Sequence, residues 1–272
     1  MSEVTATRTP SERTEPVATI TTDNVSEAFD AAAPRYDLMV GLNPGYHAHL
    51  RLAADALVET LPPAVPGVPT RLVDLGCGSG ASTAALLQAA RIRRPEVVGV
   101  DASAGMLDQA RRKIWPSGVR FEVGRAEELA WAREQWGLSD RVPGVLAAYL
   151  FRNIAERDKV LAAVFDLVDD DGTLVIQEYS VAGSAWSRMI WTMVCWLVVI
   201  PLSLVTSGQT RLYRYLWRSV LDFDSVQQLV DRLYGAGFVE VEVKSVPGWQ
   251  RGILHTLRAR KRAGGSLIMP DA

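Results

Sequence analysis

The sequence of 272 residues predicts an α/β protein built on a doubly wound, mostly parallel sheet of seven strands. From residue 71 onward, short apolar runs alternate with segments of helical spacing, which is typical of parallel strands joined by helices. The first apolar run leads into three alternate glycines, Gly76, Gly78 and Gly80, and a helical segment follows them. In a doubly wound sheet this arrangement brings the backbone close to a nucleotide-like ligand.

The predicted elements follow one another in the order that this fold requires. Apolar runs predict strands at 71–75, 96–101, 119–123, 143–149 and 173–179, then two partner strands at 238–246 and 252–260. Helical spacing predicts helices at 81–91, 103–113, 126–136 and 155–168. Three aspartates and a glycine at 169–172 predict a turn before the fifth strand.

The region before the sheet is expected to be helical. Residues 1–22 hold seven threonines and no apolar signal-peptide core, which predicts a disordered tail. Helical spacing predicts one helix over 24–36, broken at 34–37, and another over 44–61. The expected organisation is a tail (1–22), a helical lid (23–61), a ligand-binding core (70–180), an apolar cap insertion (184–220), a C-terminal helix with two strands (221–262) and a second tail (263–272).

An apolar segment precedes the last two strands. Residues 189–205 are almost wholly apolar, with Trp186, Trp191 and Trp196 in or beside them. As a helix these residues would span about 25 Å, short of the ~30 Å core of a bilayer, and Pro201 interrupts the run. A membrane span would also separate the last strands from their own sheet, so we reject it. Two interpretations stay open: a buried cap over a substrate pocket, or peripheral contact of 186–205 with the inner face of a membrane.

Composition excludes several classes of function. A hydrophobic content of 48% is typical of a globular protein, and a net charge of −2 gives no electrostatic case for nucleic-acid binding. The cysteines, Cys77 and Cys195, suggest no disulfide framework, so a reducing cytoplasmic setting is expected. Cys77 lies inside the glycine loop, where we expect it to pack as a small residue. The three histidines form no zinc pattern, so no metal is expected.

One carboxylate favours S-adenosylmethionine over a dinucleotide as the ligand, and a second is placed to bind the ribose. Asp74 stands beside the glycine loop, where it would repel a pyrophosphate but attract a sulfonium and an ammonium group. Asp101 ends the second strand, where an acid is placed to accept hydrogen bonds from both ribose hydroxyls. Alternatively, Asp101 or Ser103 caps the helix that follows.

Motifs along most of the chain suggest a known family. They are Tyr36-Asp37-Leu38-Met39, the loop 74–80, Val100-Asp101-Ala102-Ser103 with Met106-Leu107, Phe151-Arg152-Asn153-Ile154, Ile176-Gln177-Glu178-Tyr179-Ser180, Tyr213-Arg214-Tyr215-Leu216 with Ser219, Ala236-Gly237-Phe238 and Gly252-Ile253-Leu254-His255. With them the chain resembles, over roughly 29–261, the ubiquinone/menaquinone biosynthesis C-methyltransferases, which are class I S-adenosylmethionine-dependent methyltransferases with a Rossmann-like fold. The segment 189–205 is more apolar than this resemblance implies.

The resemblance also implies a set of cofactor-binding positions. Members usually carry an Asp-Ala pair after the third strand, whereas Arg125-Ala126 stands here, so the adenine contact would pass to backbone groups or to Glu127. The expected cofactor-binding residues are Tyr36, Asp74, Gly76, Cys77, Gly78, Gly80, Asp101, Ala102, Met106, Ala126 and Glu127.

Three residues are candidates for the chemistry. Carbon methylation of a quinol such as demethylmenaquinol needs an electron-rich ring held in line with the methyl group. Arg152, just past the fourth strand, is placed to stabilise a phenolate oxygen, and Asn153 to donate a hydrogen bond. His47 is the candidate general base, or a solvent-facing helical residue. The expected partner is therefore a hydrophobic small molecule.

Rival functions remain open at this point. One is methylation of another small hydrophobic molecule, such as a secondary-metabolite phenol or an isoprenoid. A nicotinamide-dependent oxidoreductase is disfavoured, because no tyrosine has a lysine four residues on, as the short-chain enzymes require. A third possibility is a protein that binds the cofactor but has no activity. The glycine loop and Asp101 favour cofactor binding and do not by themselves show turnover.

Overall fold

The structure, a computed structural model, describes residues 20–22, 24–43, 45–63, 65, 67–206, 208 and 210–263. The tail expected over 1–22 lies outside the described residues except for 20–22, and so does the tail expected over 263–272 except for residue 263. The described part contains seven strands in one sheet: β1 Arg71–Leu75, β2 Glu96–Asp101, β3 Val119–Val123, β4 Val142–Ala148, β5 Val168–Tyr179, β6 Val239–Ser245 and β7 Leu254–Arg260.

The strand order β3-β2-β1-β4-β5-β7-β6 confirms the predicted doubly wound sheet. β1 to β5 pair in parallel, and β7 runs antiparallel to both β5 and β6. The order reverses at β1, so β2 and β4 lie on either side of it. In open α/β sheets, ligands bind at the carboxyl ends of the strands next to such a reversal.

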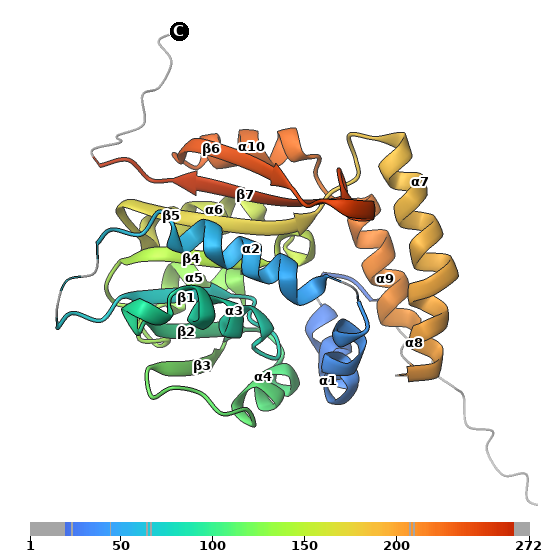
Figure 1. Ribbon diagram of the computed structural model, residues 1–272, viewed down its shortest axis with the longest axis horizontal. Helices are drawn as coiled ribbons and strands as arrows, with labels where there is room; N and C mark the ends of the chain where they lie inside the picture. Colours follow the sequence, from blue (N-terminus) through green and yellow to red (C-terminus); the bar gives the residue numbers. More distant parts are fainter. Residues whose placement is uncertain are drawn as a thin grey trace, which may run out of the picture.

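Helices cover both faces of the sheet (Figure 1). Val73 and Leu75 pack with α5, α6 and α10, whereas Leu72 faces the other way and packs with α2 and α3. Alternating burial along one strand therefore builds two hydrophobic cores. The helices are α1 Val25–Gly41, α2 Tyr46–Val58, α3 Ala81–Ala89, α4 Ala104–Arg111, α5 Leu129–Ala132, α6 Arg157–Leu167, α7 Ala185–Val194, α8 Ile200–Thr206, α9 Thr210–Leu221 and α10 Val226–Gly235.

Helix α1 corrects a prediction, because it continues through Pro34 to Gly41. A proline inside a helix removes one backbone hydrogen bond and usually kinks or ends the helix. Here Ala32 and Met39, on either side of the proline, pack in one cluster with α8 and α9. Burial on both sides offsets the local cost of Pro34, and this was not visible in the local sequence.

Two further predictions about local structure were wrong. The aspartates at 169–171 do not form a turn before β5 but lie within it, since Val168 already pairs with Val142. The ladder is irregular between this pair and the Gly144–Thr173 pair, and Asp171 takes a left-handed φ of 64°. The helix expected over 126–136 is only a 3-10 turn, Ala126–Glu128, followed by the short α5.

The apolar segment forms one long helix, so the predicted interruption at Pro201 was also wrong. Helices α7 and α8 join through a π-helical stretch, Cys195–Val199, into a helix of 22 residues over Ala185–Thr206. A π turn just before a proline leaves room for its ring. In the described part of the chain this is the one helix long and apolar enough to cross a bilayer. Only 22% of its most apolar stretch of 18 residues is buried. Figure 1 shows it beside α1 and α9 at one side of the sheet.

Candidate active site

The glycine loop is pinned to the end of β2. The backbone N–H groups of Gly76 and Cys77 both donate to the Val100 carbonyl, at 2.7 and 3.1 Å. Gly76 adopts a φ of +76°, and a Cβ on it would lie 2.9 Å from the Leu150 side chain. Only glycine satisfies both conditions, since other residues are strained at positive φ. The loop therefore depends on a residue without a side chain at this position.

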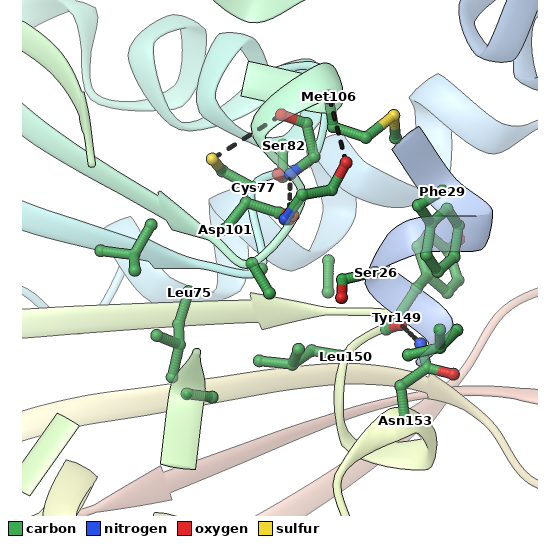
Figure 2. Close-up of a pocket in the computed structure, with 18 of the residues that line it drawn as sticks. Ser26, Phe29, Leu75, Cys77, Ser82, Asp101, Met106, Tyr149, Leu150 and Asn153 are labelled. Atoms are coloured by element: carbon green, nitrogen blue, oxygen red, sulfur yellow. Dashed lines mark hydrogen bonds between the residues drawn. The ribbon is translucent and has the colours of Figure 1, made fainter. Parts of the chain in front are cut away.

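A cavity lined by both polar and apolar groups, named the polar cavity here because a second cavity beside it is more apolar, lies where β1, β2 and β4 end. Figure 2 shows Asp101 and Met106 above it, Leu150 and Asn153 below it, and Phe29 of α1 at its right side. Helix α1 therefore lies over the carboxyl ends of the strands, where the N-terminal helices were expected. Of the predicted site residues, those lining this cavity are Tyr36, Gly76, Cys77, Gly78, Asp101, Ala102, Met106, Ala126, Glu127, Arg152 and Asn153.

Asp101 joins the glycine loop to the helix after β2. Its Oδ2 atom accepts a hydrogen bond from the Gly78 N–H at 2.7 Å, and Oδ1 accepts one from the Ser103 N–H at 2.8 Å. Burial raises the pKa of Asp101, and these two donors oppose the rise. Ser103 itself caps α4, because its Oγ accepts from the Met106 N–H at 3.1 Å. Each Asp101 oxygen keeps a lone pair, so the carboxylate can hold the backbone and still accept from ligand hydroxyls.

Asp74 and Gly80 do not line the cavity. Asp74 is fully buried, and its Oδ2 accepts hydrogen bonds from Ser82 at 2.7 Å and Thr83 at 2.6 Å. Its Oδ1 has no hydrogen-bond partner among the described residues. Burial raises the pKa of Asp74 to about 6 from its ordinary 3.8, and the two hydroxyl donors oppose the rise. Asp74 thus ties β1 to α3, behind the loop.

An Asp74→Asn variant tests this ionisation. A native pKa of about 6 means that the native state binds the proton more tightly than the unfolded state does. Ionisation therefore lowers stability as the pH rises from about 4 to above 6. We expect the unfolding free energy of the unaltered protein, relative to the variant, to fall by about 2–3 kcal/mol over this range. Urea denaturation of both proteins at pH 4.5 and 7.5 measures it; a constant difference would contradict the assignment.

A second, apolar cavity adjoins the first. It has a volume of about 400 Å³ and is walled by α1, α7, α8, α9 and the connection between β6 and β7. Its apolar residues include Met39, Val194, Leu202 and Leu216. Four residues line both cavities: Tyr36, Tyr46, Tyr149 and Arg152. This shared wall marks the junction where a ligand in one cavity would meet a ligand in the other.

An aromatic column runs along that wall. The rings of Tyr46 and Tyr149 stack at 5.4 Å, those of Tyr149 and Tyr179 at 5.2 Å, and Trp191 of α7 lies 4.9 Å beyond. Tyr149 takes a left-handed φ of 59°, which is strained for an aromatic residue. Burial raises the pKa of Tyr46, Tyr149 and Tyr179, so these hydroxyls stay protonated at neutral pH.

Arg152 forms a buried ion pair at the junction. Its guanidinium contacts the Glu178 carboxylate, which is fully buried at the end of β5, and its backbone N–H donates to the same carboxylate at 3.3 Å. The guanidinium also lies 5.8 Å from the centre of the Tyr149 ring. Although burial lowers the pKa of Arg152, Glu178 more than compensates, so the pKa is raised and Arg152 stays charged.

The structure does not bring His47 to the site. His47 is exposed on α2, against the Tyr46 ring, and lines neither cavity. His49 is buried with its Nδ1 unpartnered among the described residues, and His255 lies in β7. Burial lowers the pKa of both of these histidines. Among the described residues, neither cavity is lined by a histidine, so we do not carry His47 forward as a base.

Four site residues were missed from the sequence: Tyr46, Tyr149, Glu178 and Gln250. Glu178 and Tyr149 carried a usable signal, because Glu178 lies at the carboxyl end of β5 and Tyr149 directly follows β4, at the sheet edge where ligands bind. Tyr46 and Gln250 carried none, since only the tertiary packing brings Tyr46 to the junction and Gln250 to the apolar cavity.

The polar cavity suits S-adenosylmethionine. Asp101 lines it close to the backbone of the glycine loop, and Glu127 adds a second carboxylate. The N-terminal residues of α3, Ala81 and Ser82, line the cavity as well, but the carboxylates favour a ligand with ammonium and sulfonium charges over a pyrophosphate. Arg125 lies next to Glu127, with 3.7 Å between charged atoms.

Comparison with known proteins supports S-adenosylmethionine as the cofactor. Residues 17–258 match the model of the ubiE/COQ5 methyltransferase family. The demethylmenaquinone methyltransferase of Thermus thermophilus is 32% identical over 77% of this chain and 90% of its own length. The enzyme of that name from Deinococcus radiodurans is 29% identical over 79% of this chain and 84% of its own length.

Solved structures support the fold. The crystal structure of the [4+2]-cyclase SpnF matches with a TM-score of 0.61 at 17% identity, covering 92% of this chain and 98% of that one. The plantazolicin methyltransferase BpumL, in complex with SAH, matches with a TM-score of 0.55 at 11% identity, covering 89% and 98%. Because the family match spans most of its length, this chain belongs to the ubiE/COQ5 methyltransferase family and is an S-adenosylmethionine-dependent methyltransferase.

Proposed function

We propose that this enzyme methylates a ring carbon of a quinol-type aromatic held in the apolar cavity. The observation that carries the proposal is Arg152, a buried cation on the wall shared by the polar and the apolar cavity. A phenolate oxygen beside this cation would be stabilised, which makes the ring carbon next to it nucleophilic. The relatives named demethylmenaquinone methyltransferase support the same substrate class.

The residues divide the work between the two cavities. We propose that Asp101, with the loop Gly76–Cys77–Gly78, holds the cofactor, which supplies an electrophilic methyl group. Asp74 and Gly80 would support this loop from behind, and Tyr36 would separate the cofactor from the substrate. Asn153 lines the polar cavity, and its Oδ1 accepts a hydrogen bond from Tyr215 at 3.3 Å, so we propose that it positions the Arg152 loop.

The proposed reaction needs no histidine base. Arg152 lowers the cost of ionising the ring hydroxyl, whose proton leaves to solvent. The ring carbon bonds to the methyl group as the methyl–sulfur bond breaks, and the same carbon then loses its proton to solvent to restore aromaticity.

Transfer of labelled methyl groups tests this function. The purified enzyme is incubated with methyl-labelled S-adenosylmethionine and a reduced lipid extract containing demethylated quinols, and the products are read by mass spectrometry. Label on a quinol ring carbon is the expected result. Label on another phenol or on an isoprenoid would replace the substrate class, and cofactor binding with no transfer to any quinol would overturn it.

We also propose that the long helix Ala185–Thr206 lies in the membrane interface. Its inner side is held to α9, since Trp191 donates to the Trp217 carbonyl at 3.2 Å, so it rests on the domain and does not leave it. Arg188 in its first turn and Arg214 on α9, whose guanidinium lies 5.5 Å from the centre of the Trp196 ring, are both exposed and suit anionic head groups. Its exposed apolar residues are Trp186, Met189, Met193, Trp196, Leu197, Val198, Leu204 and Val205.

The mouth of the apolar cavity opens on the same surface. Leu42, Val198 and Trp249 all line the cavity, and they are 47%, 55% and 42% exposed. A substrate could therefore pass from the interface into the cavity without crossing water, while an apolar tail stays in lipid. This supports a peripheral position at a membrane for an enzyme that takes a hydrophobic substrate.

Vesicle flotation tests the membrane contact. A Leu204→Glu/Val205→Glu variant is expected to bind anionic vesicles about tenfold less than the unaltered protein, because two charges cannot enter the acyl region cheaply. The control is Ile92→Glu/Ile114→Glu, which changes two even more exposed apolar residues away from this helix. Equal binding of the two variants would contradict the proposal.

A further inference from the structure

We propose that the apolar cavity recognises a dihydroxylated ring as its monoanion, with the oxyanion at Arg152 and the second, neutral hydroxyl at Gln250. This inference rests on the proposed function and deepens it. It assigns to Gln250 a role in choosing the substrate, although Gln250 lies far from the glycine loop in the chain. The ring is the quinol of the proposed function, and Gln250 is the residue that would recognise its second hydroxyl.

Gln250 is a buried polar side chain on an otherwise apolar wall. It ends the turn Gly248–Gln250 between β6 and β7, is only 2% exposed, and lines the apolar cavity. Its backbone carbonyl accepts from the Ile253 N–H at 2.9 Å, which fixes the turn. The side-chain Nε2 lies 3.5 Å from the Tyr179 hydroxyl, and Oε1 has no hydrogen-bond partner among the described residues.

An unpartnered buried amide costs stability unless a ligand completes it. Leaving such a group without a partner costs about 1–3 kcal/mol, so buried polar groups are nearly always paired. A hydrophobic residue would fill this position at lower cost if the cavity bound only hydrocarbon. The Gln250 amide is therefore best explained by a polar group on the ligand.

Arg152 presents the complementary group on the same cavity. Glu178 engages its Nη1, whereas its buried Nε has no hydrogen-bond partner among the described residues. Arg152 offers an unused donor and Gln250 an unused acceptor. A hydroquinone monoanion carries one oxygen that only accepts and one hydroxyl that donates, so it satisfies both.

With Nε2 directed to the Tyr179 hydroxyl, the unpartnered Oε1 of Gln250 needs a hydrogen-bond donor, and a ring hydroxyl supplies one. A hydroxyl both donates and accepts, whereas a quinone carbonyl only accepts and a methyl ether cannot donate. The cavity should therefore discriminate against a ring whose second oxygen has no proton. Tyr179 connects the two positions. It follows Glu178, the partner of Arg152, in β5, and its hydroxyl lies 3.5 Å from the Gln250 Nε2.

A comparison of two substrates with two enzymes tests the inference. The substrates are 1,4-naphthalenediol, kept reduced, and 4-methoxy-1-naphthol, which lacks the second hydroxyl proton. The unaltered enzyme is expected to favour the diol by about 10- to 100-fold in kcat/KM. In Gln250→Met, kcat/KM for the diol should fall by about the same factor, while that for the ether stays within about twofold. The control Gln227→Met alters an exposed glutamine of α10 and should change neither.

The other possible outcomes separate the inference about Gln250 from the proposed function. An equal loss on both substrates in Gln250→Met would mean that Gln250 only supports the fold, and no loss on either would mean that it does not touch the ring. Both results reject the inference and leave the proposed function standing. Failure of the unaltered enzyme to methylate either ring, with S-adenosylmethionine bound, would reject the proposed function and the inference with it.

Discussion

Replacement of Arg152 by methionine is expected to lower kcat by about 10²- to 10³-fold and to destabilise the protein by about 3–5 kcal/mol. The loss of rate follows because methionine cannot stabilise an oxyanion on the wall that the two cavities share. The loss of stability follows because Glu178 is fully buried and would keep a charge without its partner. Labelled methyl transfer and urea denaturation measure the two effects separately.

A double variant separates catalysis from folding. In Arg152→Met/Glu178→Gln the uncompensated charge is gone, so we expect most of the stability to return while transfer stays lost. Rates are compared well below the unfolding temperature of each variant. If the double variant recovers transfer to within tenfold of the unaltered enzyme, Arg152 has no direct part in the reaction.

Asp101→Ala is expected to raise the dissociation constant of S-adenosylmethionine by at least about 100-fold. The change removes a carboxylate from the cavity and also the acceptor of the Gly78 and Ser103 N–H groups. Hydrogen bonds to a charged group contribute about 1.5–3 kcal/mol each, so the glycine loop loses its anchor together with the ligand contact. Titration calorimetry with the cofactor measures the change in affinity.

The matched control for Asp101→Ala is the loss of a helix cap elsewhere. Ser225 caps α10 by accepting from the Gln228 N–H at 3.3 Å, and α10 lies away from the cofactor cavity. Ser225→Ala should cost about 1 kcal/mol of stability and leave cofactor affinity unchanged. Cofactor affinity of Asp101→Ala that matches the unaltered enzyme would contradict the role of this carboxylate.

The central sheet could be predicted because its signals are local. β1, β2 and β3 have the bounds that the sequence predicted, since each is a short run rich in apolar residues that ends at Asp101 or just before a glycine. The cofactor side of the site follows from them, because the loop after β1 and Asp101 at the end of β2 meet at one edge. The path of α1 through Pro34 was not predictable, since distant residues of α8 and α9 support it.

The substrate side could not be predicted from local sequence. Arg152 stood out by its place after β4, but its partner Glu178 and the tyrosines around it come together only when the strands align in register. The exposure of His47 depends on which face α2 turns to the sheet. Asp74 was expected to contact the ligand, but its side chain faces α3, because side chains alternate along β1 and Asp74 points away from the cavity.

The aromatic column has a consequence for the order in which the protein assembles. Tyr46 precedes the sheet in the chain and Trp191 follows most of it, so the column closes only after distant segments have met. Closing contacts of such long sequence separation costs chain entropy before the contacts stabilise the fold, which slows folding. The wall between the two cavities is therefore complete only once α2, the sheet and α7 have assembled, and a partly folded domain would lack it.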